Sequence, residues 1–144
     1  MSTDLEWLLL RGGNSFVVKR VPEGPIFSKE PGNLLNLHSH KYSGLANSKT
    51  LHVFDNNSTV TIVHRKKSAS RHQVKPGFAT STIRSRSGPR RATGVAASYA
   101  KRGYRPDLRT AAVARVSALL SAQKEPKPTP PKKVRGKKKN AATA

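Results

Sequence analysis

Residues 49–65 read KTLHVFDNNSTVTIVHR and contain the clearest strand pattern in the chain. Two runs rich in β-branched residues, 49–54 and 58–65, lie on either side of the polar tripeptide 55–57. Asp and Asn tolerate positive φ and are common in tight turns between antiparallel strands. The stretch therefore predicts a β-hairpin, and we expect the sheet to end before residue 67.

The first residues of the chain predict a short helix. Thr3 and Glu6 form a capping-box pattern, a run of leucines follows, and Gly12 with Gly13 provides a stop. Trp7 lies among these leucines in the nearly neutral half of the chain. We therefore expect its ring to pack on the core or on a helix rather than on an RNA base.

Two short strands are expected between this helix and the hairpin. Residues 15–21 are rich in β-branched side chains and are followed by Pro22, which predicts the end of a strand. A second strand is expected around Phe27, and residues 32–48 show no regular pattern. With the hairpin, these elements predict a small α+β body at residues 1–65.

Two helices are expected in the region 93–123. The first covers about 93–102 and ends at Gly103, and the second starts with Pro106 at a first helical position and continues to the end of the region. The apolar stripe of the second helix is rich in alanine, which suits close packing on a sheet. We therefore expect this helical region to pack back on the body.

Charge is distributed unevenly along the chain. Residues 1–55 hold six basic and five acidic side chains, whereas residues 56–144 hold 22 basic and two acidic ones. Residues 56–106 contain twelve Lys and Arg but no Asp or Glu. Self-repulsion of this size destabilises a compact protein unless a polyanion neutralises it. We therefore expect nucleic acid as the partner, in preference to a basic surface that only keeps the protein soluble.

Arginine and lysine occupy different parts of the basic region. Residues 65–115 hold ten Arg and four Lys, whereas residues 124–144 hold seven Lys, one Arg and four prolines. Arginine pairs bidentately with phosphate and stacks on bases, so the first part suits fixed contacts with folded RNA. The second part predicts a disordered tail with diffuse, salt-sensitive contacts. The predicted RNA-binding residues are Arg65, Lys66, Lys67, Arg71, Lys75, Arg84, Arg86, Arg90, Arg91, Lys101, Arg102, Arg105, Arg109 and Arg115.

The segment 66–92, between the body and the helical region, is rich in Arg and Ser. It has too few apolar residues for a core of its own, so we expect an extended RNA-binding segment. The fold prediction is therefore α+β, with a small, mostly antiparallel sheet, a few helices, a long basic extension and a disordered C-terminal tail at 124–144.

Three patterns in the basic part have alternative interpretations. Tyr99 and Tyr104 lie among basic residues, as on an RNA-stacking surface, but core packing is preferred for both. Residues 84–87 read RSRS and also fit a kinase-regulated motif, which is the weaker alternative to RNA binding. Residues 132–139 resemble a nuclear import signal, which is compatible with RNA contact.

Several classes of function are not expected. The chain has no cysteine, which excludes disulfides and thiolate chemistry and favours a cytosolic or nuclear location. The longest strongly apolar run, 7–10, is too short for membrane insertion or a signal peptide. His38 and His40 lack a nearby Cys or carboxylate that would complete a metal site. No nucleophile elbow, phosphate loop or pair of carboxylates is present, so we expect no enzymatic activity.

Five short stretches form an ordered series between residues 5 and 124. They read LEWLLLR at 5–11, SFVVKR at 15–20, EPGNL at 30–34, YSGL at 42–45 and YRPDLR at 104–109, and the last continues through Ala111-Ala112, Arg115, Ser117-Ala118 and Gln123-Lys124. This series resembles the eukaryote-specific large-subunit ribosomal protein twenty-eight family. Residues 21–29 and 67–92 differ from the family pattern, so RNA contacts there are inferred from charge alone.

The resemblance implies an α+β domain embedded in ribosomal RNA, with no catalysis of its own. Combined with the charge pattern, it predicts a structural constituent of the large (60S) subunit that binds and stabilises folded rRNA through the basic extension. The expected partners are rRNA and neighbouring ribosomal proteins, with no membrane, small-molecule substrate or homo-oligomer. We expect no cofactor beyond structural Mg²⁺ that belongs to the rRNA. The expected location is the cytoplasmic ribosome, after nuclear and nucleolar transit during assembly.

Two other functions are kept as alternatives. A linker-histone-like chromatin protein also has a small domain with a tail rich in Pro and Lys, but arginine dominates the middle of this chain. The hairpin also does not suggest a winged helix. A ribosome-assembly factor with the same domain would differ by leaving the mature particle.

Overall fold

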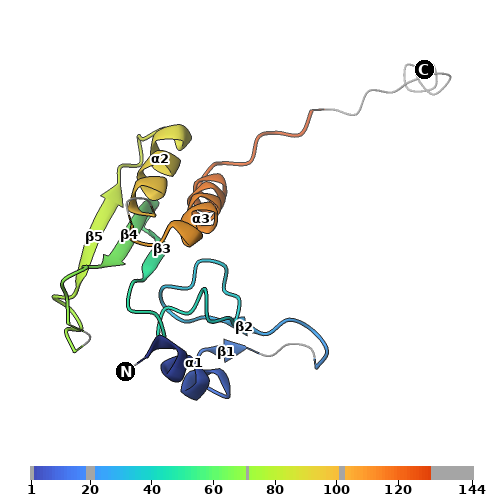
Figure 1. Cartoon of the computed structure of the whole chain (residues 1–144). Helices are drawn as coiled ribbons and strands as arrows, with labels where there is room; N and C mark the ends of the chain where they lie inside the picture. Colours follow the sequence, from blue (N-terminus) through green and yellow to red (C-terminus); the bar gives the residue numbers. More distant parts are fainter. Residues whose placement is uncertain (1, 19–21, 71, 101–102, 131–144) are drawn as a thin grey trace, which may run out of the picture.

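The computed structural model describes residues 2–18, 22–70, 72–100 and 103–130. A three-stranded antiparallel sheet in the order β3-β4-β5, with two helices on one of its faces, forms the larger part of the structure (Figure 1). A lobe with helix α1 and the two-stranded sheet β1-β2 lies at one end of it. This arrangement confirms the predicted α+β class. The elements of the larger part are β3 (Leu51–Asn56), β4 (Thr59–Arg65), β5 (Phe78–Ile83), α2 (Pro89–Tyr99), the 3₁₀ turn η1 (Pro106–Leu108) and α3 (Arg109–Ala122).

The predicted hairpin is confirmed as β3 and β4, which pair as far as Asn56↔Thr59. Its turn consists of Asn57 and Ser58, whose φ angles are 48° and 64°. Positive φ at both central residues gives a type I′ turn, whose twist matches that of the flanking strands. The turn is shorter than predicted because Asp55 and Asn56 still belong to the ladder.

The expectation that the sheet ends before residue 67 is wrong. β5 pairs along β4 from Val60↔Ile83 to Arg65↔Phe78. Only one of its side chains, that of Ile83, is buried in the core, so β5 lacks the apolar alternation by which a strand is recognised in a sequence. Its threonines favour a strand, and the ladder with β4 stabilises it. The segment has no separate core, as expected, but it contributes to the core of the body.

Helix α2 begins at Pro89, four residues before the predicted start at 93. Proline is favoured at a first helical position because its φ is already helical and it has no N–H to satisfy. The second predicted helix is confirmed, with η1 leading directly into α3. Ala92, Ala96 and Ala112 are fully buried in the core, where their small side chains let the helices and the sheet approach closely.

The N-terminal lobe contains α1 (Thr3–Arg11), β1 (Val17–Val18) and β2 (Phe27–Ser28). The helix and the two strands were expected, although residues 19–21 of the first predicted strand lie outside the described residues. The N-cap of α1 is Ser2 rather than Thr3, because the Ser2 hydroxyl accepts a hydrogen bond from the Asp4 N–H at 3.3 Å. No residue of α1 is buried. The lobe is therefore held to the sheet mainly by the segment that follows β2.

The stretches EPGNL and YSGL form the junction between the lobe and the sheet. Gly32 and Gly44 lie against each other, and a Cβ atom on Gly44 would overlap the carbonyl oxygen of Pro31. The buried carboxylate of Glu30 accepts a hydrogen bond from the hydroxyl of Ser43 at 3.1 Å. The two stretches therefore act as one structural unit, in which glycine is required by the close approach of the backbones.

The division of the chain into a body at 1–65, an extended segment at 66–92, a helical region at 93–123 and a tail at 124–144 stays a prediction. The structure adds that β5 and the start of α2, which belong to the second of these parts, pack on the first and the third.

Candidate nucleic-acid interface

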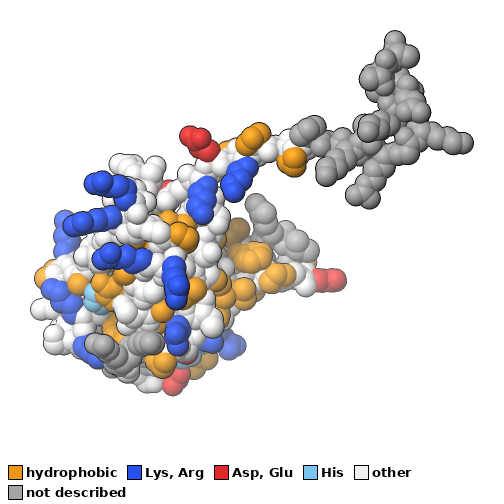
Figure 2. All heavy atoms as spheres, turned by 90° about the horizontal axis from the view of Figure 1, so that it is seen from above, with side chains coloured by type: hydrophobic (Ala, Val, Ile, Leu, Met, Phe, Trp, Pro, Cys, Tyr) orange, Lys and Arg blue, Asp and Glu red, His pale blue; other side chains and the backbone are white. Residues whose placement is uncertain are grey.

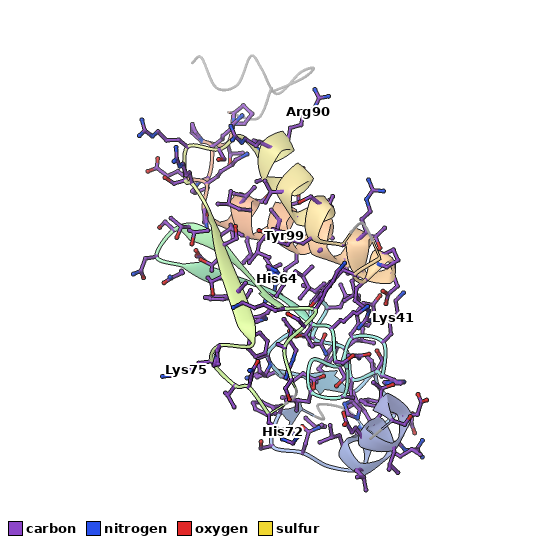
Figure 3. All side chains as sticks on the ribbon, turned by 60° about the vertical axis from the view of Figure 1, so that its left-hand side comes forward. Lys41, His64, His72, Lys75, Arg90 and Tyr99 are labelled. Atoms are coloured by element: carbon purple, nitrogen blue, oxygen red, sulfur yellow. The ribbon has the colours of Figure 1, made fainter. Side chains whose placement is uncertain are left out.

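The pairing of β4 with β5 separates the predicted RNA-binding residues into groups. The strands are antiparallel, so the residues before β5 and those after it lie at opposite ends of the sheet. A strand of six residues spans about 17 Å. The first group, residues 65–75, is named the connection end, and the second, residues 84–91, is named the turn end. Figure 3 shows His72 and Lys75 toward one end of β5 and Arg90 beyond the other.

The turn end contains Arg84, Arg86, Arg90 and Arg91, all of them exposed. The last two lie in the first turn of α2, which has no acidic residue, and the N-cap Gly88 has no side chain to cap the helix. The positive end of the helix dipole repels cations, so these two arginines are unfavourable for the helix by itself. The free N–H groups and the arginines together suit an anion such as phosphate.

Hollows lie on both sides of this turn. One, of about 330 Å³, is lined in part by Arg84, Ser87 and Arg91. The other, of about 270 Å³, is lined in part by Ser85, Ser87 and Lys124. Backbone phosphates can therefore approach the turn end from either side, and Lys124, just after α3, lies beside it.

The connection end combines exposed lysines with one arginine that is held in place. Its described members are Arg65, Lys66, Lys67 and Lys75, and Arg71 lies outside the described residues. The lysines are exposed, whereas Arg65 is half-buried. Its Nη2 donates a hydrogen bond to the carbonyl oxygen of Ser70 at 2.9 Å, and its guanidinium carbon lies 5.4 Å from the centre of the Phe78 ring. Arg65 is therefore positioned before any partner binds.

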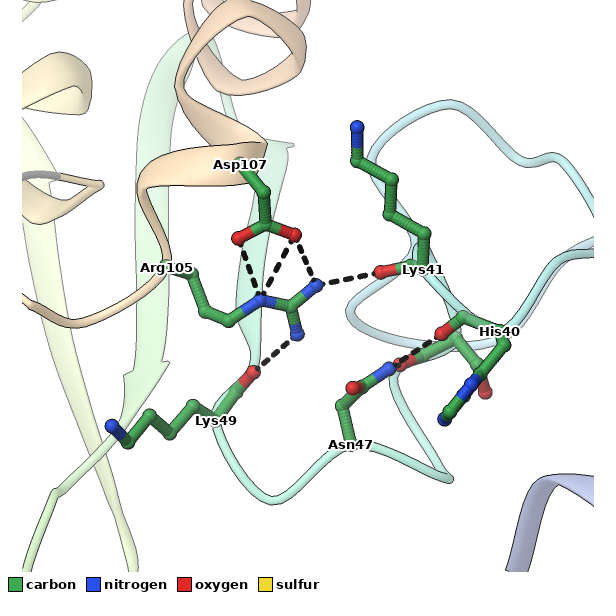
Figure 4. A network of polar contacts seen from close by, with 7 residues as sticks. His40, Lys41, Asn47, Lys49, Arg105 and Asp107 are labelled. Atoms are coloured by element: carbon green, nitrogen blue, oxygen red, sulfur yellow. Dashed lines mark hydrogen bonds and ion pairs between the residues drawn. The ribbon is translucent and has the colours of Figure 1, made fainter. Parts of the chain in front are cut away.

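Arg105 is held in a network within the protein (Figure 4). Its guanidinium donates hydrogen bonds to the carbonyl oxygens of Lys41 and Lys49, at 2.7 and 3.1 Å, and to the carboxylate of Asp107 at 2.7 Å. The hydrogen bonds from Arg105 hold the pKa of Asp107 below its ordinary value. Arg105 therefore ties the start of the helical region to the loop 41–49. The RNA contact expected of Arg105 stays a prediction.

The remaining predicted site residues belong to the helical region. Lys101 and Arg102 lie outside the described residues. Arg109 is exposed in the first turn of α3, whereas Arg115 is half-buried in the middle of that helix. The Nε of Arg115 is buried and has no hydrogen-bond partner within the described part of the chain. Of the two that the structure describes, Arg109 is therefore the exposed one.

Tyr104 joins the connection end to the helical region. Its side chain is buried, and its hydroxyl lies 2.7 Å from the carbonyl oxygen of Arg65 and 2.9 Å from that of Thr50. Burial raises the pKa of Tyr104. Tyr99 packs against the core, with its ring centre 4.7 Å from that of His64. Core packing is thus confirmed for both tyrosines.

Two of the histidines lie against Trp7 in the lobe. The ring centres of His38 and His40 are 4.9 and 5.7 Å from that of Trp7, and His40 also lies 3.6 Å from the carboxylate of Asp4. Trp7 therefore packs on lobe side chains. In the part of the chain that the structure describes, no group of three or more possible ligands is placed to hold a metal ion. No helix among residues 2–18, 22–70, 72–100 and 103–130 is long and apolar enough to cross a membrane.

Helix α1 has an exposed apolar surface that was not predicted from the sequence. Leu5, Leu8 and Leu9 are 47%, 57% and 69% exposed. This surface lies at the lower end of the molecule in Figure 1, whereas the face seen from above in Figure 2 has Lys and Arg spread over it. The spacing of these leucines indicates an apolar helix face, but it contains no information about what covers that face.

The comparisons with known proteins agree with one another. The model of the ribosomal L28e protein family matches residues 5–122, which include almost all of the described helices and strands. The large ribosomal subunit protein eL28 of Schizosaccharomyces pombe is 36% identical over 130 residues, covering 88% of this chain and 96% of the relative. That of Dictyostelium discoideum is 38% identical over 130 residues, covering 86% and 93%.

Proposed function

The chain belongs to the ribosomal L28e protein family, and from this we propose that it is a structural component of the large ribosomal subunit that binds and stabilises folded rRNA. As a member of this family, it is a ribosomal protein rather than an enzyme. Its partners in this proposal are rRNA at the basic ends and neighbouring ribosomal proteins elsewhere. It is located in the ribosome, and transit through the nucleus and nucleolus during assembly is part of the proposal.

The observation that carries the RNA-binding proposal is the pair Arg90 and Arg91 at the uncapped start of α2. At low ionic strength each cation there costs the helix about 0.3–1 kcal/mol, and no acidic side chain in the first turn offsets this. A phosphate bound at the same place makes the net interaction favourable, because it interacts favourably with the helix dipole and pairs with the guanidinium groups. The arrangement is thus unfavourable in the free protein and favourable on RNA.

The two basic ends support a role in fixing the shape of the RNA. They are separated by the length of β5, about 17 Å, and the sheet and its packed helices hold this separation. Phosphate contacts position a protein on its nucleic acid. Two such contacts at a fixed distance would hold two backbone segments relative to each other, which is a structural function.

The N-terminal lobe supports a contact with protein. Residues 1–55 carry a net charge of +1, from six basic and five acidic side chains, so they attract phosphate weakly. Leu8 and Leu9 on α1 are exposed to solvent, and burying them against another apolar surface is favourable, whereas a phosphate backbone offers no such surface. We therefore include a neighbouring ribosomal protein on α1 in the proposal.

Fractionation of cells that produce a tagged, full-length protein tests this function. We expect the protein to sediment with large subunits and polysomes and to stay bound through moderate salt, because positioned arginine contacts add to diffuse attraction. Recovery only with chromatin would favour the linker-histone alternative. Recovery only with pre-ribosomal particles would favour the assembly-factor alternative.

A further inference from the structure

The outer face of the three-stranded sheet, opposite the helices, carries a group of planar side chains. Side chains alternate along a strand, and Leu51, Val53 and Ile62 face the core. The intervening residues therefore face outward. On this outer face, Arg65 of β4 lies directly across from Phe78 of β5.

A hollow of about 360 Å³ lies at the lobe side of this outer face. The sheet contributes His52, Val63, Arg65 and Phe78 to its walls. The turns at Gly32 and Gly44, with Thr50 just before β3, contribute the rest of the rim. The volume is at the lower end of the range for small-ligand sites, about 300–1,000 Å³. The site is thus large enough for one flat group rather than for a segment of duplex.

The walls of the hollow have the chemistry that recognises a nucleobase. Phe78 is 36% exposed, and the Arg65 guanidinium lies over its ring. The ring of His52 stacks on Phe54, with centres 5.1 Å apart. Aromatic rings and guanidinium planes are the groups on which unstacked RNA bases pack.

His52 adds a hydrogen-bond donor of defined position. The backbone N–H of Gly32 donates to Nδ1 of His52 at 3.0 Å, so this nitrogen is the acceptor of the ring. Burial lowers the pKa of His52, and the charge of Arg115 lowers it further, so the ring is neutral near pH 7. In the neutral ring the proton is then on Nε2, which can donate to an acceptor on the edge of a base.

The charges around the hollow favour a nucleotide over an uncharged or cationic ligand. Lys66 and Lys75 are exposed on the connection that joins β4 to β5, next to Arg65 and Phe78. None of the described residues that line the hollow is acidic. A backbone that follows the connection end would therefore have its phosphates paired while a base enters the hollow.

We propose that this hollow binds a single unstacked base of rRNA, which stacks against the Arg65–Phe78 pair and accepts a hydrogen bond from Nε2 of His52. The site deepens the proposed function and rests on it, because rRNA supplies the base. It differs from the phosphate contacts above in that it recognises the face and edge of a base, and so makes the contact specific for an unpaired nucleotide.

Crosslinking by ultraviolet light in intact large subunits tests the site. Zero-length crosslinks form where a base touches a side chain, so phosphate contacts alone do not give them. In subunits with the wild-type, full-length chain we expect a nucleotide attached to the peptide that contains Phe78 or to the one that contains His52. Phe78→Ala should remove most of this product, and Phe78→Trp should keep it.

Phe16→Ala is the matched control, since Phe16 is 37% exposed, nearly the same as Phe78, but lies in the lobe. This variant should leave the crosslink unchanged. Absence of the wild-type chain from large subunits would overturn the proposed function. Presence of the chain with crosslinks only elsewhere, or with a peptide of another protein joined to Phe78, would overturn the base site and leave the proposed function standing.

Discussion

Arg105 and Arg90 carry the same charge but lie in opposite environments. The guanidinium of Arg105 is bound to two backbone carbonyl groups and to Asp107, and its side chain is 15% exposed. Arg90 is exposed at the start of a helix that offers it no anionic partner in its first turn. The charge of the two residues does not distinguish them, but their contacts do. The contacts indicate that Arg105 stabilises the fold and that Arg90 is available to an external anion.

Replacing Arg105 by Gln should destabilise the folded protein. The variant loses the hydrogen bonds to Asp107 and to the carbonyl groups of the loop 41–49, and we expect the free energy of unfolding at pH 7 to fall by about 1–3 kcal/mol. The free energy of unfolding of Arg105→Lys should fall nearly as far, because a single ammonium group cannot reproduce the planar fork of the guanidinium. Urea unfolding of the full-length chain measures this, with Arg109→Gln as the control at an exposed arginine nearby.

The destabilising effect of Arg105→Gln should depend on pH. The pKa of Asp107 is lowered from 3.8 in the folded protein, so the ion pair contributes stability above this value and loses it as the pH falls through the lower, folded value. The difference in stability between wild type and Arg105→Gln should therefore shrink below about pH 4. An unchanged difference in acid, or equal stability at pH 7, would contradict the structural role of Arg105.

At the scale of secondary structure, some elements could be predicted from the sequence because their local patterns are strong. The hairpin of β3 and β4 has two β-branched runs around a turn, and α3 has an alanine-rich stripe and is preceded by the proline that starts η1. β5 could not be recognised, because its middle residues are Ala, Thr and Ser and its pairing with β4 is a non-local contact. The start of α2 at Pro89 was missed for a similar reason, since RSRSG before it indicates a loop.

The start of α2 provides a prediction in which stability and function change in opposite directions. Arg90→Gln combined with Arg91→Gln removes two cations from the positive end of the helix dipole. The free protein should gain about 0.3–1 kcal/mol per cation at low salt, while incorporation into large subunits should fall. Thermal unfolding of the purified chain and gradient fractionation of cell extracts measure the two effects.

Lys29→Gln combined with Lys41→Gln is the matched control, because it also removes two exposed cations, but from positions away from the turn end. This control should change neither the thermal stability of the purified chain nor its incorporation into large subunits by a comparable amount. If the α2 variant assembled as well as wild type, the turn end would not be a site of RNA contact.

At the scale of the whole molecule, folding rearranges the basic part of the sequence. Arg65 and Arg84 are joined by one short segment but lie at opposite ends of β5, whereas Tyr104 brings the helical region to the carbonyl of Arg65. The charge pattern of the sequence predicted a set of basic contact residues and a polyanion as their partner. It could not predict their grouping or the exposed leucines of α1, since both depend on contacts between distant segments.

The most direct test of the account is the density of this chain in a cryo-EM map of mature large subunits. We predict guanidinium groups of the turn end and lysines of the connection end within hydrogen-bond distance of rRNA phosphates, and Leu8 and Leu9 covered by a neighbouring protein. A map in which both ends face solvent or protein, with only the tail on RNA, would contradict the claim that the folded body holds the rRNA.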